Sequence, residues 1–410
     1  MTNPDFHFTN IHGEKLSARI DFPADEKPVA YAIFAHCFTC AKNFKAVSHI
    51  SKALTRAGIA VLRFDFTGLG ESEGDFSEPN FSSNISDLVS AAKYLEENYQ
   101  PPYLLIGHSL GGTAVLHAAD RIASSRAVIT IGAPGDLGHV KKLLAGSRDE
   151  ISTRGEAEVH LAGRRFRITK QFIDDLERSD TEMTIRRLKK ALLVLHSPID
   201  NVVGIENAAL IFMAAKHPKS FISLDRADHM LSDPKESLYA GTIIGAWAMK
   251  YIDDPVAQEP EDSDHRVVVR TGKNGFITEV RAGRHAMIAD EPLSAGGTDR
   301  GPTPYDLLTA ALGACTSMTL QMYARRKKWP LEEAVVRLNH RKMHTKDCEE
   351  CETREGHLDH IDRELELIGP LDDEQRVRMK EIADRCPVHR TLHSEISVST
   401  HLKKKGSPPK

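Results

Sequence analysis

The stretch Tyr103-Leu-Leu-Ile-Gly-His-Ser-Leu-Gly-Gly112 decides the fold that we predict for the first half of the chain. It begins as a short apolar run, typical of a buried strand, and ends where an apolar helical pattern over residues 111–122 begins. Between them lies Gly-x-Ser-x-Gly over residues 107–111, whose glycines permit a strained turn that side chains would block. Such a turn exposes its serine at the end of a sheet, so we predict that Ser109 is a nucleophile.

The alternation of strand and helix continues on both sides of this turn. We predict six buried strands, near-continuous apolar runs at residues 30–35, 59–66, 103–107, 127–131, 191–195 and 219–224. Helical patterns between them indicate a doubly wound, mostly parallel α/β sheet over residues 1–254. An insertion at about 137–188 interrupts the rhythm and is expected over the carboxyl ends of the strands, where such sheets bind ligands.

The length, composition and net charge of the chain limit the classes of protein to which it can belong. The 410 residues predict two or three domains, and 40% hydrophobic with 27% charged residues indicates a globular chain. The net charge of −4 gives no general attraction to nucleic acid or an anionic membrane, so we expect neither partner. The N-terminus lacks the pattern of a signal peptide and no apolar run approaches a membrane span, which predicts a cytoplasmic location. Six cysteines are too few for a disulfide scaffold.

A serine nucleophile needs a general base and an acid that orients the base. In this architecture the acid and then the histidine follow the serine along the chain. Asp200 follows the run at 191–195 and His229 follows the run at 219–224, so we predict that they complete a triad with Ser109. Asp225 and Asp228 remain alternatives for the acid, although Asp228 adjoins the histidine and is poorly placed to bond its ring.

The oxyanion of such a reaction needs two backbone N–H donors, which we assign to Leu110 and Phe38. With these features, residues 5–253 resemble the α/β-hydrolase superfamily, in particular its small serine esterases. The turn Phe64-Asp-Phe-Thr-Gly-Leu-Gly-Glu-Ser72 is very similar to a turn of that superfamily. Where the family usually has His-Gly, this chain has His36-Cys37, and we interpret Cys37 and Cys40 as buried thiols beside the active site.

The sequence pattern changes after an acidic, proline-containing segment. We predict a linker over residues 255–264, an α+β domain over 265–402 and a solvated basic tail over 403–410. In the α+β domain, alternating runs predict strands before and after a long helix from residue 304 to about 327. A further helix over 372–385 and a last strand near 395–401 complete the expected domain.

Two distant cysteines mark this second domain. Cys315 lies within the long apolar helix and Cys386 ends the later one, and this arrangement resembles the OsmC/Ohr family of thiol-dependent hydroperoxide reductases over about 264–402. The resemblance implies an intertwined homodimer in which Cys315 attacks a peroxide and Cys386 resolves the sulfenic acid as a disulfide. The family's activating arginine is replaced by Lys273, and Tyr305, followed by Asp306, stands where its glutamate belongs.

A possible metal site lies between those cysteines. His340 and His344 are expected to share a strand face, and Cys348 with Cys351 forms a Cys-x-x-Cys pair nearby. A single motif of this kind in acidic surroundings is weak, so we expect no metal and no cofactor.

These observations predict a serine hydrolase that cleaves small carboxylic esters through an acyl-enzyme. The OsmC-like domain is expected to form a homodimer and to wall the partner's pocket. One alternative is an organic hydroperoxide reductase that uses Cys315 and Cys386, and another is a C-terminal domain that serves only as a scaffold.

Overall fold

The computed structural model describes residues 5–37, 41–74, 81–136, 148–161, 164–252, 267–273, 275–283, 285–344 and 357–402. The chain forms two compact units, Met1–Arg270 with Glu279–Met287, and Thr271–Thr278 with Ile288–Lys410. The first unit thus also includes short segments that we predicted for the second domain. The predicted linker over 255–264 and the predicted tail over 403–410 lie outside the described residues.

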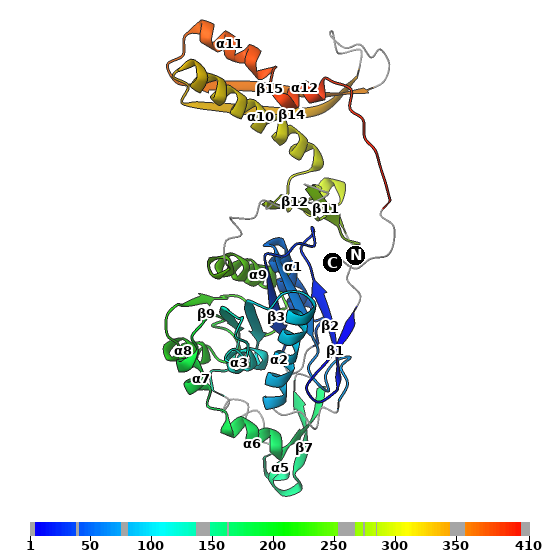
Figure 1. The fold of residues 1–410 in the computed structure, drawn as a ribbon, viewed down its shortest axis with the longest axis vertical. Coiled ribbons are helices and arrows are strands. Elements are labelled where there is room, and N and C mark those ends of the chain that lie inside the picture. The colour runs from blue at the N-terminus through cyan, green and yellow to red at the C-terminus, as the bar shows by residue number, and fades with distance from the viewer. Residues whose placement is uncertain are drawn as a thin grey trace. The chain divides into compact units, whose positions relative to one another are not determined.

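An eight-stranded sheet in the order β1-β2-β4-β3-β5-β6-β9-β10 forms the centre of the first unit (Figure 1). β1, β2 and β4 pair antiparallel, and the remaining neighbours from β4 to β10 pair in parallel. The parallel strands coincide with the six apolar runs of the sequence, which confirms the predicted α/β fold. The strands are β1 (Phe6–Thr9), β2 (Lys15–Asp21), β3 (Ala30–Ala35), β4 (Ile59–Phe64), β5 (Leu104–His108), β6 (Ala127–Ile131), β9 (Ala191–His196) and β10 (Lys219–Ser223).

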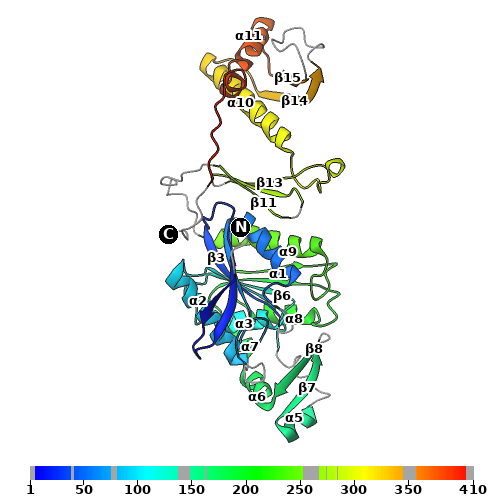
Figure 2. The same ribbon diagram turned by 90° about the vertical axis from the view of Figure 1, so that its right-hand side faces the viewer.

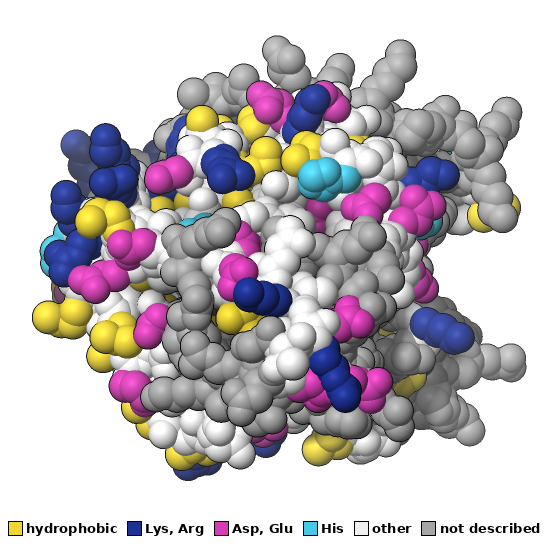
Figure 3. All heavy atoms as spheres, turned by 90° about the horizontal axis from the view of Figure 1, so that it is seen from below, with side chains coloured by type: hydrophobic (Ala, Val, Ile, Leu, Met, Phe, Trp, Pro, Cys, Tyr) yellow, Lys and Arg dark blue, Asp and Glu magenta, His cyan; other side chains and the backbone are white. Residues whose placement is uncertain are grey.

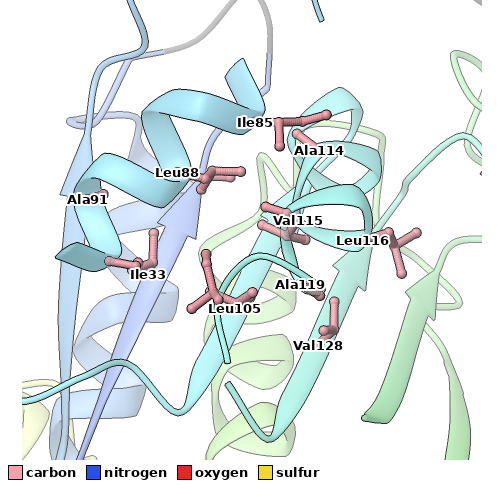
Figure 4. Packing of buried hydrophobic residues seen from close by; sticks show 14 of the residues in the cluster. Ile33, Ile85, Leu88, Ala91, Leu105, Ala114, Val115, Leu116, Ala119 and Val128 are labelled. Atoms are coloured by element: carbon pink, nitrogen blue, oxygen red, sulfur yellow. The ribbon is translucent and has the colours of Figure 1, made fainter. Parts of the chain in front are cut away.

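Helices cover both faces of this sheet because alternate residues of its strands face two separate cores. In β3, Ile33 belongs to one core and Phe34 to the other. Figure 2 shows α2 on one side of β3, and α1 and α9 on the other. Figure 4 shows side chains of α2 and α3 packed against Ile33, Leu105 and Val128. The helices are α1 (Lys45–Arg56), α2 (Phe81–Asn98), α3 (Leu110–Ala118), α8 (Glu206–Ala214) and α9 (Pro234–Ala248), followed by the 3-10 turn Met249–Tyr251.

The insertion after β6 folds as a small helical and hairpin segment. It contains α5 (Arg148–Arg154), the antiparallel pair β7 (Glu156–Leu161) and β8 (Arg164–Thr169), α6 (Lys170–Arg178) and α7 (Thr181–Arg187). The Ser82 N–H and hydroxyl donate to the Asp175 carboxylate at 2.7 and 2.8 Å, which ties α6 to the start of α2. Figure 3 views the molecule from this end, where hydrophobic, acidic and basic side chains are intermixed among the described residues.

The second unit is built around one long helix. α10 (Pro304–Lys327) packs on the antiparallel pair β14 (Glu333–His344) and β15 (His357–Ile368), with α11 (Asp373–Ala383) and α12 (Pro387–Leu392) following. A capping box of Thr303 and Asp306 begins α10. β11 (Val267–Thr271), β12 (Thr278–Ala282) and β13 (His285–Ala289) form a three-stranded sheet, most of which belongs to the first unit, and the 3-10 turn Leu293–Ala295 follows it in the chain. The α+β class that we predicted is confirmed.

The last strand that we predicted, near residues 395–401, does not form in this single chain. Residues 395–400 have no assigned secondary structure and pair with no strand in the described part of the chain. Alternation along the sequence predicts an extended backbone, but a strand also needs an edge to pair with. None of the described helices is long and apolar enough to span a membrane.

Candidate active site

Ser109 lies in a sharp turn between β5 and α3, as the sequence pattern predicts. Its backbone has φ +54° and ψ −128°, a region that residues with side chains rarely occupy. The flanking glycines are needed for close packing, because a Cβ on Gly107 would lie 2.2 Å from the Gly111 carbonyl oxygen. A Cβ on Gly111 would lie 2.5 Å from the Ala35 carbonyl oxygen. Residues 107 and 111 must therefore be glycine for the backbone to pack closely around Ser109.

The structure brings Ser109, His229 and Asp200 together in one hydrogen-bonded chain. His229 Nε2 is 3.0 Å from Ser109 Oγ, and His229 Nδ1 is 2.7 Å from Asp200 Oδ2. The three residues follow β5, β10 and β9, whose carboxyl ends meet at one edge of the parallel sheet. This geometry suits the transfer of the serine proton to a histidine whose tautomer is set by a carboxylate.

The Asp200 carboxylate is held in its ionised form. Burial raises its pKa, but the hydrogen bond and charge of His229, together with the N–H groups of Val202 and Val203, lower it below the usual value. Both N–H groups donate to Oδ1 at 2.9 Å. Oδ1 therefore fixes the carboxylate to the backbone, and Oδ2 accepts from the His229 ring.

The two alternative acids make other contacts. Asp225 Oδ1 accepts from the Ser223 hydroxyl at 2.5 Å, and Asp228 Oδ1 accepts from the Ser232 N–H at 2.8 Å. Within the described residues, Asp200 is the carboxylate that bonds the His229 ring. This agrees with the argument that an acid adjoining the histidine in sequence is badly placed to reach Nδ1.

One of the two proposed oxyanion donors lies in the described part of the chain. Leu110 is the first residue of α3, where N–H groups have no partner within the helix. Phe38 lies outside the described residues.

Cys37 is disulfide-bonded, which corrects our interpretation of a buried thiol there. Because Cys315 and Cys386 are free, its partner lies outside the described residues.

The residues that flank the Phe38 loop are anchored by Asp65. Its Oδ1 accepts from the Lys42 backbone N–H at 2.6 Å, and its Oδ2 accepts from Lys42 Nζ at 3.2 Å and from the Glu71 N–H at 3.1 Å. Asp65 belongs to the turn at residues 64–72 that we noted in the sequence. The turn therefore holds one end of the loop from which the second oxyanion donor is expected.

A further buried histidine touches this site and was not predicted from the sequence. His108 Nε2 is 2.7 Å from the backbone oxygen of His229, although 121 positions separate the two residues. His108 adjoins the serine in the motif itself, yet nothing in the motif indicates where its side chain points.

The two cysteines of the second unit lie near the start of α12. Both are free thiols, Cys315 partly exposed and Cys386 buried. Val388 N–H donates to Cys315 Sγ at 3.5 Å, and His389 N–H donates to Cys386 Sγ at 3.3 Å. The structure thus brings both sulfurs to one short helix.

The cation that we predicted for this pair is not among its contacts. No hydrogen bond or ion pair joins Lys273 to either sulfur in the described residues. Arg363 instead donates to the Thr316 hydroxyl at 3.2 Å, and this hydroxyl is 3.5 Å from Cys386 Sγ. Arg363 lies on β15 and also pairs with Asp384. Its position in an alternating strand gave no indication of this contact.

The weak metal candidate is only partly described. His340 Nε2 is 3.0 Å from Asp359 Oδ1, and its ring stacks on Tyr305 with centroids 4.1 Å apart. His344 ends β14, and Cys348 and Cys351 lie outside the described residues. In the described ranges, no group of three or more histidine, cysteine or acidic side chains is arranged to hold a metal ion.

The fold and the arrangement around Ser109 define the class of a serine-type α/β hydrolase. Comparison with known proteins agrees: residues 27–152 match the family described as serine aminopeptidase, S33, and residues 297–401 match the OsmC-like protein family. A solved esterase domain from a Rhodothermus marinus protein is 52% identical, with 61% of this chain covering 98% of that domain at a TM-score of 0.52. The chain therefore belongs to the α/β-hydrolase esterases through its first part, and its second part is an OsmC-like domain.

More distant relatives show how far this likeness extends. The mitochondrial palmitoyl-protein thioesterase ABHD10 of Mus musculus is 31% identical over 162 residues, which are 38% of this chain and 48% of that protein. The Rattus norvegicus protein of the same name matches over 42% of its length, so the chain spans about half the length of these relatives. The solved mouse protein is 22% identical at a TM-score of 0.52, with 60% of this chain covering 99% of that one, and shows the shared fold alone.

Proposed function

We propose that this enzyme hydrolyses small carboxylic esters and thioesters through an acyl-enzyme on Ser109. One observation carries the proposal: Ser109 Oγ, the two ring nitrogens of His229 and Asp200 Oδ2 form a continuous chain with distances of 3.0 and 2.7 Å. Kinship with esterases supports the reaction class, and the thioesterase relatives support thioesters as a second leaving-group class.

In this proposal each residue has one role in the reaction. His229 Nε2 takes the Ser109 proton as Oγ attacks the substrate carbonyl carbon, and Asp200 stabilises the resulting imidazolium. The N–H of Leu110, and by our assignment that of Phe38, stabilises the negative oxygen. Collapse of this intermediate breaks the bond to the alcohol or thiol, which leaves with the proton from His229. Water then attacks the acyl group by the reverse sequence and releases the carboxylic acid.

A panel of substrates tests this function. Short-chain and long-chain oxygen esters, the matching thioesters and an aminoacyl amide are assayed with wild-type protein and Ser109→Ala. We expect turnover of the short esters and thioesters, and a fall on the order of 10⁶ for Ser109→Ala because the triad acts as a unit. A Ser109→Ala protein that keeps a tenth of the wild-type rate would contradict the proposal. Amide turnover faster than ester turnover would instead assign a peptidase.

We also propose that the second unit forms a homodimer. The OsmC/Ohr resemblance implies a homodimer, and Leu308, Met318 and Met322 of α10 are 39%, 65% and 71% exposed in the single chain. The extended residues 395–402 also expose Ile396 and Val398 at 56% and 83%. A second copy provides a matching apolar face and a strand edge for this segment.

Light scattering of the whole chain and of a chain ending at Ile252 tests the dimer. We expect a dimer and a monomer respectively. A dimeric truncated chain would place the interface in the hydrolase unit, and a monomeric whole chain would contradict the proposal.

The contacts of Cys315 and Cys386 favour one second candidate function. Both sulfurs accept N–H groups from the first turn of α12, and Arg363 lies one hydroxyl away from Cys386. Two free thiols held at one short helix could form and then resolve a sulfenic acid, so a dithiol-dependent reduction of organic hydroperoxides is a candidate activity. Peroxide loss that depends on Cys315 and not on Ser109 would support it. Equal rates for wild type and Cys315→Ser would leave this unit as a scaffold.

A further inference from the structure

His108 bonds the backbone of the residue that we propose as the general base. Its Nε2 lies 2.7 Å from the His229 carbonyl oxygen, and the ring centroids are 5.1 Å apart at an interplanar angle of 40°. A carbonyl oxygen can only accept, so Nε2 of His108 carries the hydrogen. The bond is buried, and His108 itself is 4% exposed.

The charge state of His108 suits the donation of this one hydrogen bond. Burial, followed by the charge of nearby His229, lowers the pKa of His108 to about 3. The ring is therefore neutral at the pH where hydrolases work, and it has one N–H to donate. That N–H is committed to the His229 carbonyl, so His108 is suited to hold a position and not to exchange protons.

This bond completes a three-point attachment of His229. Nδ1 faces Asp200, Nε2 faces Ser109, and the carbonyl oxygen is fixed by His108. His108 immediately precedes Ser109 at the end of β5, whereas His229 lies in the loop after β10. A side chain of the nucleophile's own strand thus fixes the backbone of the base.

We propose that His108 is a positioning residue that sets the distance and alignment between His229 and Ser109 through its hydrogen bond to the His229 carbonyl. The inference rests on the proposed function, because the alignment matters only if this pair performs the hydrolysis. The alternative is that His108 is an ordinary core histidine whose loss lowers stability without changing turnover.

Two substitutions separate these roles. In His108→Gln the amide nitrogen is as many bonds from Cα as Nε2 is, so it can donate to the same carbonyl, whereas His108→Met has similar bulk and no donor. For His108→Met we expect kcat to fall about 10- to 100-fold with KM within about threefold, since the base is misaligned and substrate binding is retained. For His108→Gln we expect kcat within about fivefold of wild type.

His117→Met is the matched control. His117 is also a largely buried histidine of the first unit, with its pKa lowered to about 4 chiefly by burial, but it contacts Thr181 and Thr184. We expect its kcat to remain within about twofold of wild type, because neither threonine belongs to the site.

A spectroscopic readout accompanies the kinetics. The proton shared by His229 Nδ1 and Asp200 is expected to give a low-field NMR resonance in wild type and His108→Gln, and a shifted or broadened one in His108→Met. Wild-type kcat and resonance in His108→Met, with Ser109→Ala inactive, would overturn this inference alone. An active Ser109→Ala would instead overturn the proposed function. If His108→Met fails to fold, His108→Asn, whose shorter amide cannot reach the carbonyl, replaces it with the same expected loss.

Discussion

Gly132 lies directly against the carboxylate of Asp200: a Cβ on this glycine would stand 3.3 Å from Asp200 Oδ2 and 3.5 Å from His229 Nδ1. Gly132 follows β6 with φ +54°, a conformation that favours glycine. The backbone after β6 therefore forms a wall behind the bond between acid and base. A Cβ at this position requires the Asp200 carboxylate to shift by a few tenths of an ångström.

We expect Gly132→Ala to lower kcat about tenfold and the free energy of unfolding by about 1 kcal/mol, through misalignment of Asp200 and strain at positive φ. Steady-state kinetics and denaturant unfolding measure the two effects. Gly155 gives the matched control, because it has φ +83° and a Cβ added there would meet no atom within 4 Å. Gly155→Ala should lose stability only. Equal kcat for both variants would show that the backbone at Gly132 does not constrain Asp200 and His229.

The identity of the acid is tested by amide substitutions. Asp200→Asn is expected to reduce kcat about 10⁴-fold, because an amide cannot stabilise the same histidine tautomer. Asp225→Asn removes only the acceptor for Ser223 and should leave kcat within about twofold. Ester hydrolysis by the two purified variants decides between them. A larger loss in Asp225→Asn would show that the acid is wrongly assigned.

Acid should destabilise the first unit through its buried histidines. The folded pKa of His117 is lowered to about 4 from 6.5, so the unfolded state binds more protons between these values. Stability is therefore complete above pH 6.5 and is lost as pH falls toward 4, by about 2 kcal/mol at pH 5. The difference in unfolding free energy between pH 7 and pH 5 should shrink by that amount in His117→Gln. An unchanged difference would show that His117 titrates normally in the folded protein.

The buried pair beside the oxyanion loop gives a stability prediction. The side chains of Lys42 and Asp65 are each 1% exposed, with Lys42 Nζ 3.2 Å from Asp65 Oδ2. Lys42→Met leaves a buried carboxylate without its cation and should cost about 3 kcal/mol or more. Lys52→Met, at an exposed position of α1, should cost less than about 0.5 kcal/mol. Adding Asp65→Asn to Lys42→Met should recover part of the loss, and no recovery would contradict a charge effect.

The core of the first unit could be predicted because its strands are buried on both faces. Continuous apolar runs then show each strand, and the alternation with helices shows the parallel order. Ser109, Asp200 and His229 could be proposed for the same reason, since residues that follow parallel strands meet at one edge of the sheet. Asp225 and Asp228 also lie between Ser109 and His229 in the chain, so the observed bond from the His229 ring to Asp200 was needed to separate Asp200 from them.

Other features depend on contacts that a linear pattern does not contain. The bond from His108 to His229 joins the end of β5 to a loop 121 positions away in sequence. Arg363 reaches Thr316 from a strand whose alternation resembles any exposed hairpin. The extended residues 395–402 have the alternation of a strand but no edge within the described chain. Each of these three features depends on residues that are distant in sequence, so the sequence alone did not predict it.

Covalent labelling is the most direct test of whether Ser109 is an activated nucleophile. The whole protein is treated with an alkyl fluorophosphonate, in which a serine oxygen displaces fluoride to form a phosphonate ester, and intact mass and peptide mapping follow. We predict one phosphonyl group per chain, on the peptide that contains Ser109, and none in Ser109→Ala. Unlabelled wild-type protein, or a label that persists in Ser109→Ala, would show that Ser109 is not the activated nucleophile.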